Sequence, residues 1–132
     1  MNLNIGQQFS VSREVTEELV RQFAEVSGDH NPIHLSDEFA KTTRFGRRIA
    51  HGMLSGAFIS AVLGNEFRDM KIVYLSQTLR FRAPVYLGDT VTAIATVTAI
   101  REDKQIVTLD TKCMNQNGET LVTGDAAVMI MV

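Results

Sequence analysis

The segment from Met53 to Leu63 is the most constraining feature of this chain, because it is apolar and is interrupted only by Ser55 and Ser60. It is well short of the roughly 20 residues that a helix needs to cross a bilayer. We expect a helix from His51 to about Asn65 that other parts of the same domain bury, since a helix that is apolar nearly all round has no face suited to water. We therefore expect no membrane segment here.

Small residues form a stripe along this expected helix, at Gly52, Gly56, Ser60 and Gly64. Positions four apart lie on one side of a helix, so the stripe is narrow. A glycine in a helix interior costs about 1 kcal/mol relative to alanine, so this placement needs a reason. Two reasons are open at this point: close packing of the helix against the sheet, or space for a ligand beside the helix.

Helical patterns occupy the first half of the chain. Thr16 is suited to cap a helix whose first turn is acidic, where the helix dipole favours carboxylates. Residues 28–32 are predicted to end that helix as a loop, because glycine commonly stops helices and proline biases the residue before it away from helical geometry. A short second helix follows, capped by Ser36 or Asp37, and runs to about Thr42.

The hydrophobic period changes from helical to two after Met70, as is typical of strands with one buried face. Threonine alternates with apolar residues between Thr90 and Ala99. Asn117-Gly118 predicts a type I′ hairpin turn, and Gly124 is a candidate bulge. The predicted strands cover residues 71–81, 90–99, 106–114 and 119–130.

These elements predict one α+β domain over residues 1–132, in which the apolar helix covers one face of a mostly antiparallel sheet. A chain of 132 residues is long enough to build a single core. Its 13 Lys and Arg residues against 15 Asp and Glu residues give a net charge of −2. We therefore expect no nucleic-acid partner, since such proteins carry a strong basic excess.

Two further patterns bear on the compartment. Cys113 is the single cysteine, so an intrachain disulfide is excluded, which fits a reducing compartment. It lies in a predicted strand, and we interpret it as a small core or pocket residue rather than a nucleophile. The first residues lack a basic region followed by an apolar one, so we expect no signal peptide and a cytoplasmic location.

The first candidate for chemistry is the cluster of Asp29, Asn31 and His34 around the proline turn. Histidine is suited to move a proton near neutral pH, and a nearby carboxylate can share that work or orient the imidazole. Asp and Asn beside proline are also favoured turn residues for purely structural reasons. By itself, the cluster leaves both interpretations open.

The second candidate is His51-Gly52-Met53, which opens the apolar helix. A helix N-terminus presents unpaired N–H groups and the positive end of the helix dipole, and glycine lets a ligand approach the backbone. Such N–H groups suit an oxyanion, including one that develops on a thioester carbonyl. An acid/base pair together with a backbone oxyanion site is what addition of water to an α,β-unsaturated thioester requires.

The pattern Ser-Gly-Asp-x-Asn-Pro-x-His at residues 27–34, followed by His-Gly-Met at 51–53, resembles the hydratase motif of the MaoC-like, (R)-specific enoyl-CoA hydratases. The pattern is specific, and the resemblance covers nearly the whole chain. Further matches lie at residues 24–26, 39–40, 45, 49–50, 74–77, 81–89 and 118.

This resemblance implies a hot-dog fold, in which an antiparallel sheet wraps a long central helix. It also implies a homodimer whose two sheets join, with active sites at the subunit interface. By the same resemblance, Asp29 and His34 are the catalytic pair that activates water and transfers the proton. Asn31 would help to orient the catalytic loop or the water. The Gly52 N–H would bind the thioester carbonyl, and Ser60, unless it is only one more small residue of the stripe, would support the carboxylate.

The implied activity is that of a lyase, the reversible hydration of trans-2-enoyl-CoA to (R)-3-hydroxyacyl-CoA, as used in fatty acid metabolism or polyhydroxyalkanoate supply. Coenzyme A is part of the substrate, and no separate cofactor is expected. Three alternatives stay open: a dehydratase of acyl-carrier-protein thioesters, a hot-dog acyl-CoA thioesterase, and a non-catalytic acyl-thioester binding module. Fold alone does not choose between them, although a mere binder would not need the Asp29/His34 pair. The acyl chain length is not readable.

Other histidines and basic residues have less specific interpretations. His30 occupies a variable place in the motif and receives no role, and His51 is interpreted as a helix-start histidine with a structural hydrogen bond. Pro32 prevents His30 and His34 from sharing a helix face as in zinc helices, so no metal site is expected. Contacts with coenzyme A phosphates stay unassigned among the basic residues Lys41, Arg44, Arg47, Arg48, Arg80 and Arg82.

Overall fold

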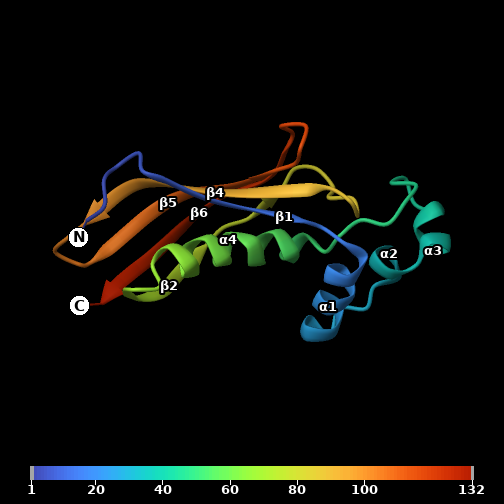
Figure 1. Ribbon diagram of the computed structural model, residues 1–132, viewed down its shortest axis with the longest axis horizontal. Coiled ribbons are helices and arrows are strands. Elements are labelled where there is room, and N and C mark those ends of the chain that lie inside the picture. Colours follow the sequence, from blue (N-terminus) through green and yellow to red (C-terminus); the bar gives the residue numbers. More distant parts are fainter. Residues whose placement is uncertain (1, 132) are drawn as a thin grey trace.

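The computed structural model describes residues 2–131 as a curled antiparallel sheet with one long helix packed along it (Figure 1). The helices are α1 (Glu17–Ser27), α2 (Pro32–Leu35), α3 (Asp37–Lys41) and α4 (Gly52–Glu66). The strands are β1 (Gln8–Glu14), β2 (Lys71–Gln77), β3 (Arg80–Phe81), β4 (Thr90–Arg101), β5 (Ile106–Met114) and β6 (Thr120–Met131). The expected hot-dog arrangement of sheet and central helix is confirmed.

The strands follow the order β1-β4-β5-β6-β2 in one sheet, and β3 pairs with β6 beyond the end of β2. Every pair is antiparallel. β1 and β2 are thus the edge strands. Figure 1 shows α1, α2 and α3 gathered at the end of the sheet where α4 begins. The three short helices and the loops between them therefore lie near the N-terminus of α4.

Helix α4 presents its large apolar residues to the sheet. Its buried side chains include Leu54, Phe58, Ile59, Val62 and Leu63. Full burial of one such side chain contributes about 1.5–3 kcal/mol. Every second residue of β4 from Val91 to Val97 is buried, so a row of small apolar side chains faces the core. The expected alternation of threonine and apolar residues thus holds as far as a register shift after Val97. The helix predicted from hydrophobicity is thus the centre of the core.

The small-residue stripe lies mostly outside this core. A side chain at Gly52 would collide with the ring of Phe81, whose nearest atom lies 2.9 Å from the position of a Cβ. At Gly56 the nearest atom is Leu79 Cδ1, at 3.3 Å. Ser60 and Gly64 are exposed in the single chain. Close approach of β3 and the segment before it therefore explains the first two small residues of the stripe, and the helix-to-sheet core does not.

The predicted helix caps are confirmed. The Thr16 side chain accepts a hydrogen bond from the Leu19 N–H at the start of α1, and Gly28 ends the helix with a φ of 78°. Ser36, not Asp37, caps α3 by accepting from the Phe39 N–H. These local signals are readable from sequence because each cap bond spans only three residues.

Four details of the prediction were wrong. Strand β1 was missed, although Phe9 and Val11 alternate with polar residues in it. The helical turn α2 was not predicted, and its first residue, Pro32, was assigned to the loop. The predicted strand over 71–81 is interrupted at residues 78–79, between β2 and β3. The β5–β6 hairpin is present, but its turn is not type I′, because within residues 2–131 Gln105 is the one non-glycine residue with positive φ.

Gly124 has a different role from the expected bulge. The β5–β6 register is continuous through it, with Thr111 as its partner. A Cβ at Gly124 would instead overlap the carbonyl group of Thr78, whose carbon lies 2.8 Å away. The interruption between β2 and β3 therefore passes directly over the Gly124 backbone, and only glycine leaves room for it.

Within residues 2–131, no helix has both the length and the apolar character needed to span a membrane.

Candidate active site

The loop between α1 and α2 is shaped by its own polar side chains. Asp29 Oδ1 accepts a hydrogen bond of 3.2 Å from the Asn31 N–H. Asn31 Oδ1 accepts one of 3.1 Å from the Ile33 N–H and so caps α2, with Pro32 in its first turn. Both contacts are turn chemistry. Within residues 2–131 no hydrogen bond reaches the second carboxylate oxygen of Asp29, and the residue is exposed, so this oxygen is available for a substrate or water.

His34 is the buried member of the predicted pair, with 8% of its surface exposed. Its Nδ1 lies 2.7 Å from the carbonyl oxygen of Ile49. A carbonyl only accepts, so Nδ1 carries the proton and Nε2 carries the lone pair. The ring is thus fixed in the tautomer whose Nε2 can take a proton from water.

Burial lowers the pKa of His34 below its ordinary value of 6.5. The hydrogen bond to the Ile49 carbonyl opposes this shift, the neighbouring His51 lowers the pKa further, and the Asp29 carboxylate raises it. The dominant cause is the loss of water around the imidazolium. His34 is therefore neutral and able to act as a base at neutral pH.

His51 joins the same cluster from the N-cap of α4. Its Nε2 lies 3.0 Å from the Asp29 carbonyl oxygen, and its ring stacks on the His34 ring with centroids 3.9 Å apart and planes at 28°. One donor atom from each of Asp29, His34 and His51 lies within 4.8 Å of the others. The structure thus brings Asp29 and His34 together and adds His51, whose expected structural hydrogen bond is present. His30 is exposed.

Three such side chains also raise the question of a metal ion. His34 Nδ1 and His51 Nε2 are both occupied by carbonyl oxygens. Each of the two stacked rings therefore keeps one nitrogen without a carbonyl partner. The expectation that this site binds no metal stays a prediction.

A cavity of about 300 Å³ adjoins this cluster. His34 and Gly52 both line it. Gly52 is the first residue of α4, so the N-terminus of this helix borders the cavity. No side chain caps that end of the helix, so its N–H groups are suited to bind an oxyanion. The remaining walls are mostly apolar, with basic groups added: Arg44, Phe45, Ile49, Ala50, Ser55, Phe81, Arg82, Ala83, Pro84, Val85 and Val122.

Ser60 lies elsewhere in the single chain. It lines a second cavity of about 400 Å³ between α4 and β2, together with Gly56, Tyr74 and Leu79. No hydrogen bond joins it to Asp29 among the described residues. The role predicted for Ser60 from the family resemblance stays a prediction.

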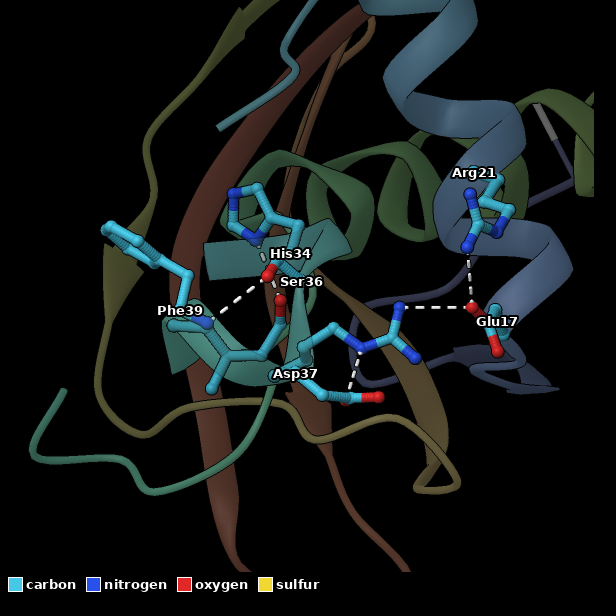
Figure 2. A network of polar contacts seen from close by, with 8 residues as sticks. Glu17, Arg21, His34, Ser36, Asp37 and Phe39 are labelled. Carbon is cyan, nitrogen blue, oxygen red and sulfur yellow. Dashed lines mark hydrogen bonds and ion pairs between the residues drawn. The ribbon is translucent and has the colours of Figure 1, made fainter. Parts of the chain in front are cut away.

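A network of ion pairs holds the site's elements in place (Figure 2). Arg48, just before α4, contacts Glu17 of α1 at 3.2 Å and Asp37 of α3 at 2.8 Å. Arg21 also contacts Glu17. The hydrogen bond from Arg48 lowers the pKa of the Glu17 carboxyl group most, and the one from Arg21 lowers it further. Arg48 is thus a structural link between helices α1 and α3.

Two basic side chains lie over aromatic rings. The Arg47 guanidinium stacks over the Tyr86 ring at 3.9 Å, and the Arg44 guanidinium lies 5.3 Å from the centre of the Phe45 ring.

Cys113 is fully buried, and burial raises the pKa of its thiol to about 12. A thiol that stays protonated is a poor nucleophile, in agreement with the interpretation of Cys113 as a core residue.

Known proteins are similar to this chain over most of its length. The family model of the MaoC-like domain matches residues 3–117. An (R)-specific enoyl-CoA hydratase of Rhodospirillum rubrum is 45% identical over 95% of this chain and 86% of its own length. A mitochondrial 3-hydroxyacyl-[acyl-carrier-protein] dehydratase of Arabidopsis thaliana is 35% identical over 98% of this chain and 78% of its own.

Among solved structures, the (R)-hydratase from A. caviae involved in PHA biosynthesis superposes with a TM-score of 0.94. It is 44% identical, and the match covers 98% of both chains. The similarity therefore includes the sheet, the central helix and the loop that carries the candidate residues.

Proposed function

The chain belongs to the MaoC-like domain family, and from this membership and the proximity of Asp29 to His34 we propose that it is an (R)-specific enoyl-CoA hydratase. The enzyme adds water reversibly to trans-2-enoyl-CoA and forms (R)-3-hydroxyacyl-CoA. The observation that carries the proposal is the Asp29/His34/His51 cluster next to an uncapped helix N-terminus. It combines proton-transfer groups with an oxyanion site.

In the proposed mechanism, the Asp29/His34 pair takes a proton from a water molecule, and His34 Nε2 is the free lone pair for that step. The water oxygen bonds to the β-carbon, and the electrons of the double bond move toward the thioester oxygen. The Gly52 N–H stabilises the resulting enolate-like charge. The pair then delivers a proton to the α-carbon, so that no net proton is consumed. The step needs no redox change, and we propose no cofactor besides the coenzyme A of the substrate.

We propose that the active enzyme is a homodimer. Asp29 is exposed in the single chain, although a hydration site works best when bulk water is excluded. Edge strand β2 also exposes apolar side chains, with exposed fractions of 42% at Val73 and 46% at Leu75. Pairing of β2 with a second copy would satisfy this edge and join the two sheets.

The single buried cysteine supports a reducing compartment, and we place the enzyme in the cytoplasm.

Crotonyl-CoA is the substrate for testing the function. We expect the enoyl absorbance to fall while no free thiol appears, because water adds to the double bond and leaves the thioester intact. Release of thiol would instead identify a thioesterase. If the absorbance is unchanged with crotonyl-CoA but falls with crotonyl-acyl-carrier protein, the dehydratase alternative, favoured by the Arabidopsis relative, is correct.

The pH profile of the reaction should reflect the environment of His34. We expect kcat/KM to decline on the acidic side with a midpoint below 6.5, because His34 must be neutral to accept a proton and burial lowers its pKa from that value. As pH falls through the lowered pKa, the imidazole gains a proton and the base is lost. An acidic midpoint above 6.5 would show that another group limits the reaction.

A further inference from the structure

His51 is buried at the start of α4, with 2% of its surface exposed. Its Nε2 lies 3.0 Å from the backbone carbonyl oxygen of Asp29, so Nε2–H donates to that oxygen. The bond joins the loop after α1 to the N-terminus of α4 across 22 positions of sequence. It therefore fixes the backbone of the proposed catalytic carboxylate relative to the proposed oxyanion site.

The ring of His51 is held from two sides. His34 stacks on one side with a centroid distance of 3.9 Å, and Phe23 of α1 packs edge-on with a centroid distance of 5.0 Å and an angle of 60°. Rotation of the imidazole would break both contacts. The donor Nε2–H thus has one direction available, toward Asp29.

The second nitrogen supports the same reading. Among the residues that the structure describes, His51 Nδ1 is the single buried side-chain nitrogen or oxygen atom without a hydrogen-bond partner. A buried polar atom without a partner is costly. The chain tolerates this unpartnered atom, which indicates that the ring is retained for its Nε2–H and its packing.

We propose that His51 is a positioning residue of the hydratase site, which acts by holding the Asp29 backbone through its Nε2–H while its ring supports the His34 imidazole. The proposal rests on the hydratase function proposed above. His51 does not touch the reacting atoms, and its effect passes through Asp29 and His34. It therefore belongs with the supporting hydrogen bonds that orient catalytic groups, whose loss commonly costs about 10–100-fold in activity.

Three substitutions separate the hydrogen bond from the ring. His51→Gln places an amide N–H near the Nε2 position, and His51→Asn places it near Nδ1, too far from the Asp29 carbonyl. His51→Phe keeps an aromatic ring without a donor. With crotonyl-CoA we expect kcat of the Asn and Phe variants to fall about 10–100-fold, with KM within about threefold of the parent. The Gln variant should keep kcat within about fivefold.

Thermal melting of each variant reports folding, and the exposed neighbour His30→Gln serves as the control with parental kinetics. Parental kcat in all three His51 variants would overturn the proposal, and so would a Gln variant as slow as the Asn variant. If the Asn and Phe variants fail to fold, the Gln variant decides alone: kcat below a tenth of the parent overturns the proposal. A parent inactive on enoyl thioesters would instead overturn the hydratase function itself.

Discussion

Asp29→Asn is expected to lower kcat for crotonyl-CoA hydration by about 10²–10⁴-fold, the usual range for loss of a positioned acid/base group. The substitution removes the negative charge but leaves an oxygen that can still accept from the Asn31 N–H at the position now 3.2 Å away. The turn should therefore persist, and the loss should reflect chemistry. Steady-state kinetics with circular dichroism of the same sample would measure both.

His34→Ala provides the partner measurement for Asp29. If the two groups act as one unit, the double variant should be little slower than either single variant, because catalytic groups that act together are not additive. Glu25→Gln, an exposed carboxylate of α1, is the matched control and should behave as the parent. Near-parental turnover in either single variant, with the dimer intact, would contradict the proposed mechanism.

Gly124→Ala is expected to cause a large loss of stability, about 3 kcal/mol. The new Cβ would overlap the Thr78 carbonyl group, and two hydrogen bonds hold Thr78 to Asp125. Its N–H donates to the Asp125 carbonyl at 2.9 Å, and its hydroxyl oxygen accepts from the Asp125 N–H at 2.9 Å. The backbone cannot move aside without breaking these bonds. The melting temperature at fixed protein concentration should fall by roughly 10 °C.

Gly64→Ala is the matched control in the same chain. No atom lies within 4 Å of a Cβ at Gly64 in helix α4. Alanine is favoured over glycine in a helix interior by about 1 kcal/mol, so this variant should melt at the same temperature or higher. Equal melting temperatures for the parent, Gly64→Ala and Gly124→Ala would show that the Thr78 crossing imposes no packing limit.

The elements that could be predicted from the sequence are those whose deciding interactions are local. The caps at Thr16 and Ser36 span three residues, and the period-two pattern of β4 depends on the strand itself. The pairing of Asp29 with His34 was also predicted, because a short motif places them around one turn. The break between β2 and β3 was not predictable, since it arises from Thr78 crossing Gly124, far away in sequence.

By itself, the sequence indicated the buried central helix, because hydrophobic period is a property of neighbouring residues, and its resemblance to a known family indicated the family and the candidate acid/base pair. Only the tertiary structure decided the tautomer of His34, the bond from His51 to Asp29 and the ion pairs of Arg48. Each of these joins segments that are distant along the chain. Their partners meet only once folding has brought the start of α4 and the residues before it against α1, α2, α3 and the loop after α1, since a hydrogen bond or ion pair requires contact in space.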